Sequence, residues 1–219
     1  LKLKTSNNSY LPYFLLLIHP AFMASNLVVA RGGVEYVPPI SLAFWRWFFV
    51  FLILIPFTYQ IIFKNIRYLK NESKKLFFLG AMGCGVCGVF PFIAGTTTPI
   101  ANMGIIYTSS PIFIILISSY FYKEILNTIQ LLGLVLCFVG VVSIITKGDV
   151  NFLIDLKFTS GDLWMLGAAV GWALYAVLLH NWKSKFTLFS RLTIIAFFGA
   201  ASILPFSLIE NYFVRPVIF

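Results

Sequence analysis

Long apolar stretches follow one another along almost the whole chain, and they restrict its folding more than any other feature of the sequence. Each has the roughly 20 mostly apolar residues that a transmembrane helix needs. The runs are continuous rather than alternating, which disfavours a β-barrel. The seven stretches are Tyr10–Ala30, Pro39–Phe63, Leu76–Gly95, Ile100–Tyr122, Leu126–Thr146, Asp162–His180 and Leu188–Ile209. We therefore predict an all-α fold, a polytopic bundle of transmembrane helices.

The composition supports the same class of protein. Hydrophobic residues make up 60% of the 219 residues and charged residues 11%, whereas a soluble domain is about half apolar and about a quarter charged. A single core of this size cannot hide so many apolar side chains, and so few charges cannot solvate its surface. The first apolar stretch is also too long for a signal peptide, and further spans follow it.

The basic residues predict the orientation of the bundle in the membrane. With the N-terminus in the cytoplasm, the inner segments hold 11 Lys and Arg residues and the outer segments hold 4, as the positive-inside rule requires. The cluster Lys64–Lys75 is then a cytoplasmic loop that faces anionic lipid, and Lys147–Gly161 is an outer loop. The net charge of +9 follows from this topology, so binding to nucleic acid is not expected.

An internal repeat is found when the chain is compared with itself at an offset of 149 residues. This offset pairs the first span with the sixth and the second with the seventh. The clearest matches join Pro56-Phe57 to Pro205-Phe206 and Phe48-Phe49 to Phe197-Phe198. Because the copies are five spans apart, an odd number, they would cross the membrane in opposite directions. Inverted repeats of this kind are typical of secondary transporters, whose binding site lies between the repeats near the middle of the membrane.

Several short motifs, each weak alone, occur in a fixed order along nearly the whole chain. They are Ser25-Asn26 in the first span, Pro38-Pro39 and Arg46 in the second, Pro111 and Lys123-Glu124 in the fourth, Leu131-Leu132-Gly133 and Gly140-Val141-Val142 in the fifth, and Gly161-Asp162-Leu163 and Gly171-Trp172-Ala173-Leu174-Tyr175 in the sixth. In this order they resemble the drug/metabolite transporter superfamily, specifically proteins built from two EamA domains. The usual Trp of the first span is replaced by Met23, although Trp172 stands at the equivalent place in the second copy.

This resemblance implies ten spans in two inverted repeats of five helices, of which this chain holds seven. We therefore expect a fragment without the last three helices. The first EamA repeat would cover residues 10–146, and the truncated start of the second would cover residues 161–219.

The resemblance also implies a function. The protein would be a secondary transporter in the cytoplasmic (inner) membrane, moving amino-acid-like, nucleoside-like or drug-like solutes by alternating access. A lipid flippase or a structural membrane subunit of the same fold is the alternative. An enzyme is not expected, because no cluster of His, Asp and Glu lies at a membrane interface. The expected partners are a small-molecule solute and membrane lipid, with a homodimer left open, and no metal or organic cofactor is implied.

Arg46 is the first candidate for the binding site. It lies about seven residues into the second span, roughly 10 Å deep at 1.5 Å per residue. A cation at that depth is costly and marks a functional site by default, unless its long stem reaches the outer interface. It is suited to pair with a carboxylate or phosphate of the solute.

Polar and aromatic groups inside other spans complete the predicted site. His19 precedes Pro20, which can kink the first helix, and Asn26 lies two turns further on along the same face. Asn102 and Tyr107, with Thr108, Ser109 and Ser110 just before Pro111, make the fourth span unusually polar. Trp172 and Tyr175 lie one turn apart in the sixth. An Asn facing lipid would leave its amide unpaired at a cost of several kcal/mol. We therefore expect these residues to line a central cavity with Arg46, although hydrogen bonding and packing between helices are the simpler alternatives.

The pair Cys84 and Cys87 has the CxxC spacing of redox and metal sites, but its surroundings favour packing. The cysteines lie inside an apolar stretch, where Gly80, Cys84 and Gly88 recur every four residues and form a stripe of small side chains. No Asp or Glu lies in the middle of a span, so these seven helices offer no central carboxylate for coupling to protons.

Overall fold

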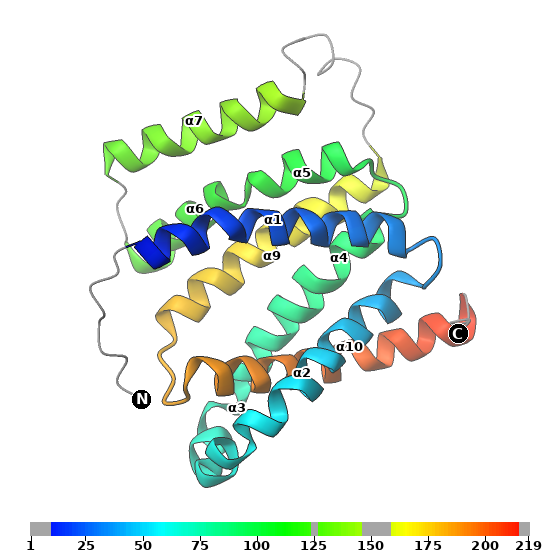
Figure 1. Cartoon of the computed structure of the whole chain (residues 1–219), viewed down its shortest axis with the longest axis vertical. Helices are drawn as coiled ribbons and strands as arrows, with labels where there is room; N and C mark the ends of the chain where they lie inside the picture. Colours follow the sequence, from blue (N-terminus) through cyan, green and yellow to red (C-terminus); the bar gives the residue numbers. More distant parts are fainter. Residues whose placement is uncertain (1–9, 124–126, 146–158, 215–219) are drawn as a thin grey trace.

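The computed structural model describes residues 10–123, 127–145 and 159–214, and every regular element within these ranges is a helix. The elements are α1 (Tyr10–Gly33), α2 (Pro39–Lys64), α3 (Ile66–Gly80), the π-helix η1 (Ala81–Val86), α4 (Cys87–Ala94), α5 (Ile100–Thr108), α6 (Ser110–Tyr122), α7 (Thr128–Ile145), α9 (Ser160–Asn181) and α10 (Leu188–Phe213). In Figure 1, α7 lies along one edge of the bundle, α1, α5, α6 and α9 occupy the middle, and α2 and α10 lie at the opposite edge.

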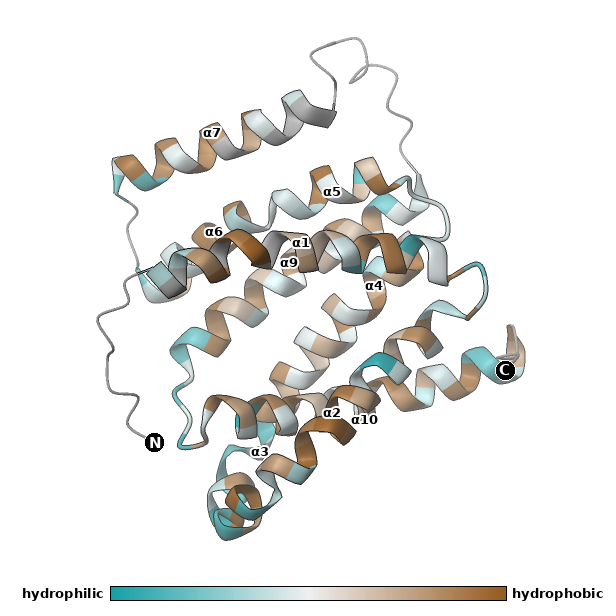
Figure 2. Ribbon diagram, in the orientation of Figure 1, coloured by the Kyte–Doolittle hydropathy of each residue, from teal (hydrophilic) through white to brown (hydrophobic). Residues whose placement is uncertain are grey.

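Five helical segments in the described part of the chain are long and apolar enough to cross a membrane. They are Pro39–Lys64, Ile66–Ala94, Ile100–Tyr122, Ser160–Asn181 and Leu188–Phe213. The helices α1 and α7 cover the first and fifth predicted spans with 24 and 18 residues. Apolar residues extend along most helices in Figure 2. The predicted all-α, polytopic membrane bundle is thus confirmed.

The segment Lys64–Lys75 is helical rather than the loop that we expected. Asn65 alone separates α2 from α3, and α3 continues through η1 and α4 without a break. The segment is amphipathic, because Leu76 and Leu79 are buried while the basic side chains of the first turns are exposed. Charge thus predicts the polar face of this segment correctly, but it does not distinguish a loop from an amphipathic helix. The predicted outer loop lies mostly at residues 146–158, outside the described residues.

The fourth span is broken at Ser109, between α5 and α6. Pro111 has no N–H to donate to the carbonyl of Tyr107, four residues before it. The hydroxyl of Ser110 donates to that carbonyl instead, and Thr108 and Ser109 bond in the same way to carbonyls three residues back. These hydroxyls therefore satisfy the backbone at the break, as lipid-embedded helices require.

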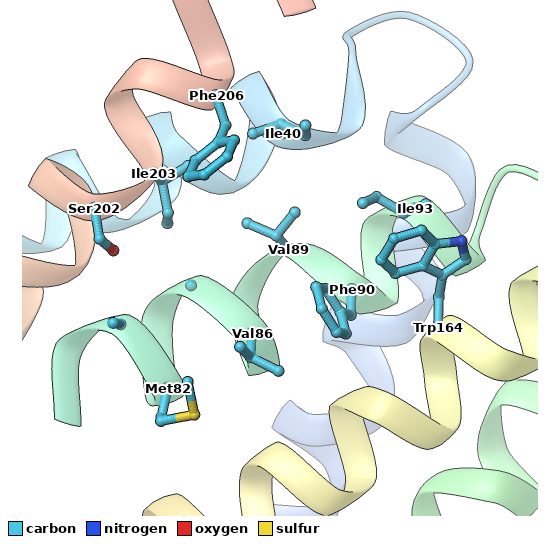
Figure 3. Close-up of a pocket in the computed structure, with 12 residues that line it drawn as sticks. Ile40, Met82, Val86, Val89, Phe90, Ile93, Trp164, Ser202, Ile203 and Phe206 are labelled. Carbon is cyan, nitrogen blue, oxygen red and sulfur yellow. The ribbon is translucent and has the colours of Figure 1, made fainter. Parts of the chain in front are cut away.

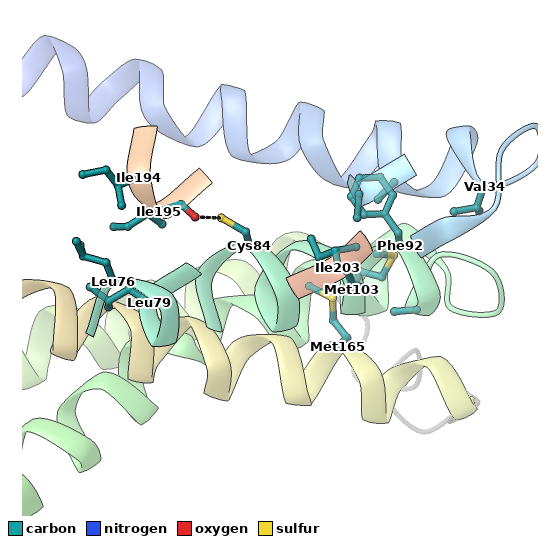
Figure 4. Close-up of a cluster of buried hydrophobic side chains, with 14 of the residues drawn as sticks. Val34, Leu76, Leu79, Cys84, Phe92, Met103, Met165, Ile194, Ile195 and Ile203 are labelled. Carbon is teal, nitrogen blue, oxygen red and sulfur yellow. Dashed lines mark hydrogen bonds between the residues drawn. The ribbon is translucent and has the colours of Figure 1, made fainter. Parts of the chain in front are cut away.

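Gly80 and Cys84 of the small-residue stripe lie where α3 and η1 cross α10. A Cβ atom on Gly199 would lie 2.2 Å from Cβ of Cys84, and one on Gly80 would lie 2.7 Å from the backbone nitrogen of Gly199. The thiol of Cys84 lies 3.8 Å from the carbonyl oxygen of Ile195, the dashed contact in Figure 4. Both Cys84 and Cys87 are buried and free of disulfides. The packing interpretation of the CxxC pair agrees with this geometry.

The helices α2 and α10 run antiparallel along a common interface. Ser41, near the start of α2, contacts Ser207 near the end of α10, and Thr58, near the end of α2, contacts Thr193 near the start of α10. An inverted repeat at the 149-residue offset requires opposite directions for these two helices. The antiparallel packing of α2 and α10 is consistent with an inverted repeat.

Candidate functional site

Arg46 ties three helices together in the interior of the bundle. Its Nη1 donates to Oδ1 of Asn26 on α1 at 2.6 Å, and its Nη2 donates to the carbonyl oxygen of Gly88 on α4 at 3.3 Å. Both Arg46 and Asn26 are half-buried. The side chain therefore does not simply extend along α2 to the outer interface, and two residues that the sequence predicted for one site are in direct contact.

Aromatic rings flank the guanidinium group. Its central carbon lies 5.3 Å from the ring centroid of Trp47 and 4.9 Å from that of Phe92, within the range of cation–π attraction. Two buried donors beside each other, Nε of Arg46 and Nε1 of Trp47, have no hydrogen-bond acceptor in the described part of the chain. No described carboxylate pairs with Arg46. The site is thus a cation with spare donors and no counter-charge among these residues.

Gly88 makes this arrangement possible. A Cβ atom at that position would lie 2.6 Å from Nε1 of Trp47 and 3.1 Å from Nη2 of Arg46, closer than side chains normally approach. The hydrogen on Gly88 therefore lets the indole and the guanidinium group pack against the backbone of α4. The sequence predicted Gly88 as part of a helix-packing stripe, and the structure adds its contact with Arg46.

A second aromatic cluster joins α5 to α9. The rings of Tyr107 and Trp172 are 6.4 Å apart between centroids, and those of Trp172 and Tyr175 are 5.6 Å apart. Tyr175 packs over Gly83, where a Cβ atom would lie 2.6 Å from its ring. The cluster thus connects α5, α9 and, through Gly83, η1.

The remaining predicted residues are less closely connected. Asn102 is buried, with 9% of its surface exposed, but it is the third residue of α5 rather than central in the span. Its amide makes no hydrogen bond to the described residues. The side chain of His19 lies outside the described residues, so its predicted role stays a prediction.

Two residues beside the cation were not among the predicted site residues. Trp47 is next to Arg46 in the sequence, but as one aromatic residue among many in that span it gave no signal. Phe92 approaches the cation from α4. Only the packing of α4 against α2 shows which of the chain's 24 Phe residues does so.

A separate apolar cavity of about 410 Å³ lies between α2, η1, α4, α9 and α10. Val89, Phe90, Trp164, Ile203 and Phe206 are among its lining residues, shown in Figure 3. Its only hydroxyl-bearing lining residue, Ser202, bonds to a carbonyl of its own helix. None of the residues predicted to bind solute lines this cavity, so it is distinct from the region around Arg46.

Comparison with known proteins agrees with this architecture. The EamA-like transporter family matches residues 11–146. An uncharacterised transporter of Bacillus subtilis strain 168, YyaM, is 29% identical over 202 residues, which are 91% of this chain and 65% of the relative. An uncharacterised transporter of Archaeoglobus fulgidus is 29% identical over 211 residues, which are 94% of this chain and 70% of the relative. The chain thus spans about two thirds of the length of these relatives. No solved structure matches it significantly. The chain therefore belongs to the EamA-like transporter family, within the drug/metabolite transporter superfamily.

Proposed function

We propose that the whole protein is a secondary transporter of small organic solutes that carry an acidic group, and that Arg46 binds this group. The observation that carries the proposal is the guanidinium group held inside the bundle without a carboxylate partner in the described part of the chain. Asn26 and Gly88 accept hydrogen bonds from Arg46 but bring no negative charge. A cation in a medium of low polarity is costly when it is unpaired, and an anionic solute would offset that cost.

The neighbouring groups suit the rest of such a solute. The unpartnered N–H groups of Arg46 and Trp47 are two further donors for an oxyanion. Phe92, Tyr107, Trp172 and Tyr175 offer ring faces and edges to an apolar or aromatic part. Binding pockets for small molecules combine such apolar walls with a few polar groups that fix orientation. The proposed mechanism is alternating access at a site between the two repeats.

A matched panel of solutes tests this proposal. The whole protein would be reconstituted in vesicles, and uptake and efflux would be measured for amino-acid-like, nucleoside-like and drug-like compounds. Each compound would be offered as the free acid or phosphate and as its neutral ester or amide. We expect transport of at least one acidic member and much weaker transport of its neutral counterpart. Equal transport of both members of every pair would contradict a role for the charge of Arg46.

We also propose that the N-terminus and the start of α3 face the cytoplasm of the cell. The exposed residues Arg67, Lys70, Lys74 and Lys75 gather at the α2–α3 end of the bundle, where positive charge is favoured on the inner face. Cysteine at Lys70 should stay unlabelled by an impermeant maleimide on intact cells. Cysteine at Tyr36, which is 75% exposed in the turn between α1 and α2, should be labelled. Labelling of Lys70→Cys but not Tyr36→Cys would reverse this orientation.

A further inference from the structure

The interface between α2 and α10 is fastened by a carboxylate at one end. Helix α2 begins with Pro38 at its N-cap and Pro39 at its first position, so its first free N–H groups belong to Ile40 and Ser41. No side chain of α2 itself caps them. Both N–H groups donate to Glu210 of α10, at 3.1 and 2.8 Å. Glu210 thus caps α2 from another helix, where its negative charge also suits the positive end of the helix dipole.

Hydroxyl groups extend this contact across the same end of the interface. Oγ of Ser41 lies 3.0 Å from Oε2 of Glu210 and 3.1 Å from Oγ of Ser207. Ser41, Ser207 and Glu210 are 0%, 3% and 6% exposed. The predicted seventh span ended at Ile209, and the structure continues α10 to Phe213, which brings Glu210 into the helix. This carboxylate is therefore held within the interface.

The other end of the same interface is closed as well. Oγ1 of Thr58 lies 3.0 Å from Oγ1 of Thr193, and both side chains are buried. Ser41 and Thr58 are 17 positions apart on α2, which is about 25 Å of helix at 1.5 Å per residue. Since the hydrocarbon core is about 30 Å thick, the two contacts lie close to opposite faces of the membrane. Between them, Phe51 of α2 packs against Phe197 of α10, with ring centroids 5.3 Å apart.

The α2–α10 interface is in contact at both ends at once, and this favours a structural role over a role as the solute path. A solute path that opens alternately to the two sides must break its contacts at one face in each open state. An interface sealed at both faces in one state is instead suited to rigid-body motion of other elements around it. We infer that the α2–α10 interface is the stationary axis of the transporter, and that Glu210 is the residue that fixes its outer end. This inference rests on the proposed transport function.

Crosslinking tests the axis directly. In the whole protein, with the native cysteines replaced by alanine, Ser41→Cys/Ser207→Cys would link the outer end and Thr58→Cys/Thr193→Cys the inner end. The native Oγ separations of 3.1 and 3.0 Å place the sulfur atoms within reach of a disulfide after a small movement. Each oxidised variant should transport the best solute of the panel within about twofold of the same sample after reduction, because a fixed axis does not move during the cycle. A larger loss for either crosslink would show that this end opens and would overturn the inference.

A second measurement does not depend on transport. Spin labels at Tyr59 of α2 and Leu188 of α10, both exposed, would report the separation of the two helices with and without solute. We expect one narrow distance that solute does not change, whereas two populations would overturn the inference. If the whole protein transports nothing in the panel, the proposed function fails, and the spin-label distances still decide whether the interface is fixed.

Glu210 has its own test. Glu210→Gln keeps one acceptor oxygen in place of the two that Ile40 and Ser41 use, whereas Glu210→Leu removes both. This test uses spin labels at the Glu210 end, on Tyr36 just before α2 and on Tyr212 of α10, which are 75% and 84% exposed. If Glu210 positions α2, the Leu variant should broaden the distances between these labels, and the Gln variant should broaden them less. A narrow distribution in the Leu variant would show that Glu210 does not fix this end.

Discussion

Replacing Arg46 with Gln should lower the uptake of the best acidic solute by roughly 30-fold or more, because removing one partner of a buried, hydrogen-bonded charge pair typically costs about 2 to 5 kcal/mol. Gln keeps an amide that can bond to Asn26 and to the carbonyl oxygen of Gly88, the two contacts that Arg46 makes in the structure. The change therefore removes the charge while leaving hydrogen-bonding capacity. The measurement is the initial rate of uptake into vesicles, divided by the amount of folded protein.

Two controls separate charge from structure in this experiment. Arg46→Lys keeps the charge but loses the planar, forked geometry, so it should retain more uptake of the acidic solute than Arg46→Gln. The neutral ester of the same solute should be transported about equally by the wild-type protein and by Arg46→Gln. If Arg46→Gln is folded and transports the acidic solute like the wild type, Arg46 has a structural role only, and the proposed site is wrong.

Replacing Gly199 with Val should prevent normal folding. Even a Cβ atom there would lie 2.2 Å from Cβ of Cys84 and 3.1 Å from the carbonyl oxygen of Gly80. Overfilling a packed interior usually costs about 1 to 3 kcal/mol, and the cost should exceed this range here, because the obstacle includes backbone that cannot rotate away. We expect most of the protein to aggregate in detergent, measured by size-exclusion chromatography and thermal unfolding.

A matched glycine shows whether the effect comes from packing. Gly104 also lies within a helix, but nothing lies within 4 Å of a Cβ atom placed there, so Gly104→Ala should leave the unfolding temperature unchanged or raise it. Gly199→Ala should be milder than Gly199→Val, and adding Cys84→Gly to it should recover stability by removing the atoms it meets. A normally folded Gly199→Val protein would show that α3, η1 and α10 do not cross as closely as described.

The spans could be predicted from the sequence because lipid imposes one strong condition, a continuous run of apolar residues. The stripe at Gly80, Cys84 and Gly88 was also visible, since its spacing matches the helical repeat. The residues on other helices that pack against this stripe could not be predicted. That Gly199 meets Cys84 while Gly88 meets Arg46 depends on how the helices cross, and spacing along one helix carries no such information.

The candidate site was predictable only in part, for a similar reason. Asn26 and Arg46 could be found because polar groups are costly in lipid, and the structure joins them directly. Trp47 and Phe92 are apolar residues in an apolar chain, so only their position beside a cation distinguishes them. Glu210 was missed because it stood just beyond the seventh predicted span, and its bond to α2 joins residues 170 positions apart.

The π-helix η1 determines the directions in which the side chains of α4, up to Ala94, point around the helix axis. In this segment the N–H of Cys87 donates to the carbonyl of Met82, five residues back rather than four, which is equivalent to one residue inserted into an α-helix. One residue corresponds to about 100° of rotation around the helix axis. Deleting a single residue between Ala81 and Val86 would thus turn Gly88 and Phe92 away from Arg46 by about a quarter of a turn, although no side chain of the site had been changed. The direction in which α4 presents these two residues to the cation is therefore encoded in the length of the backbone that precedes them.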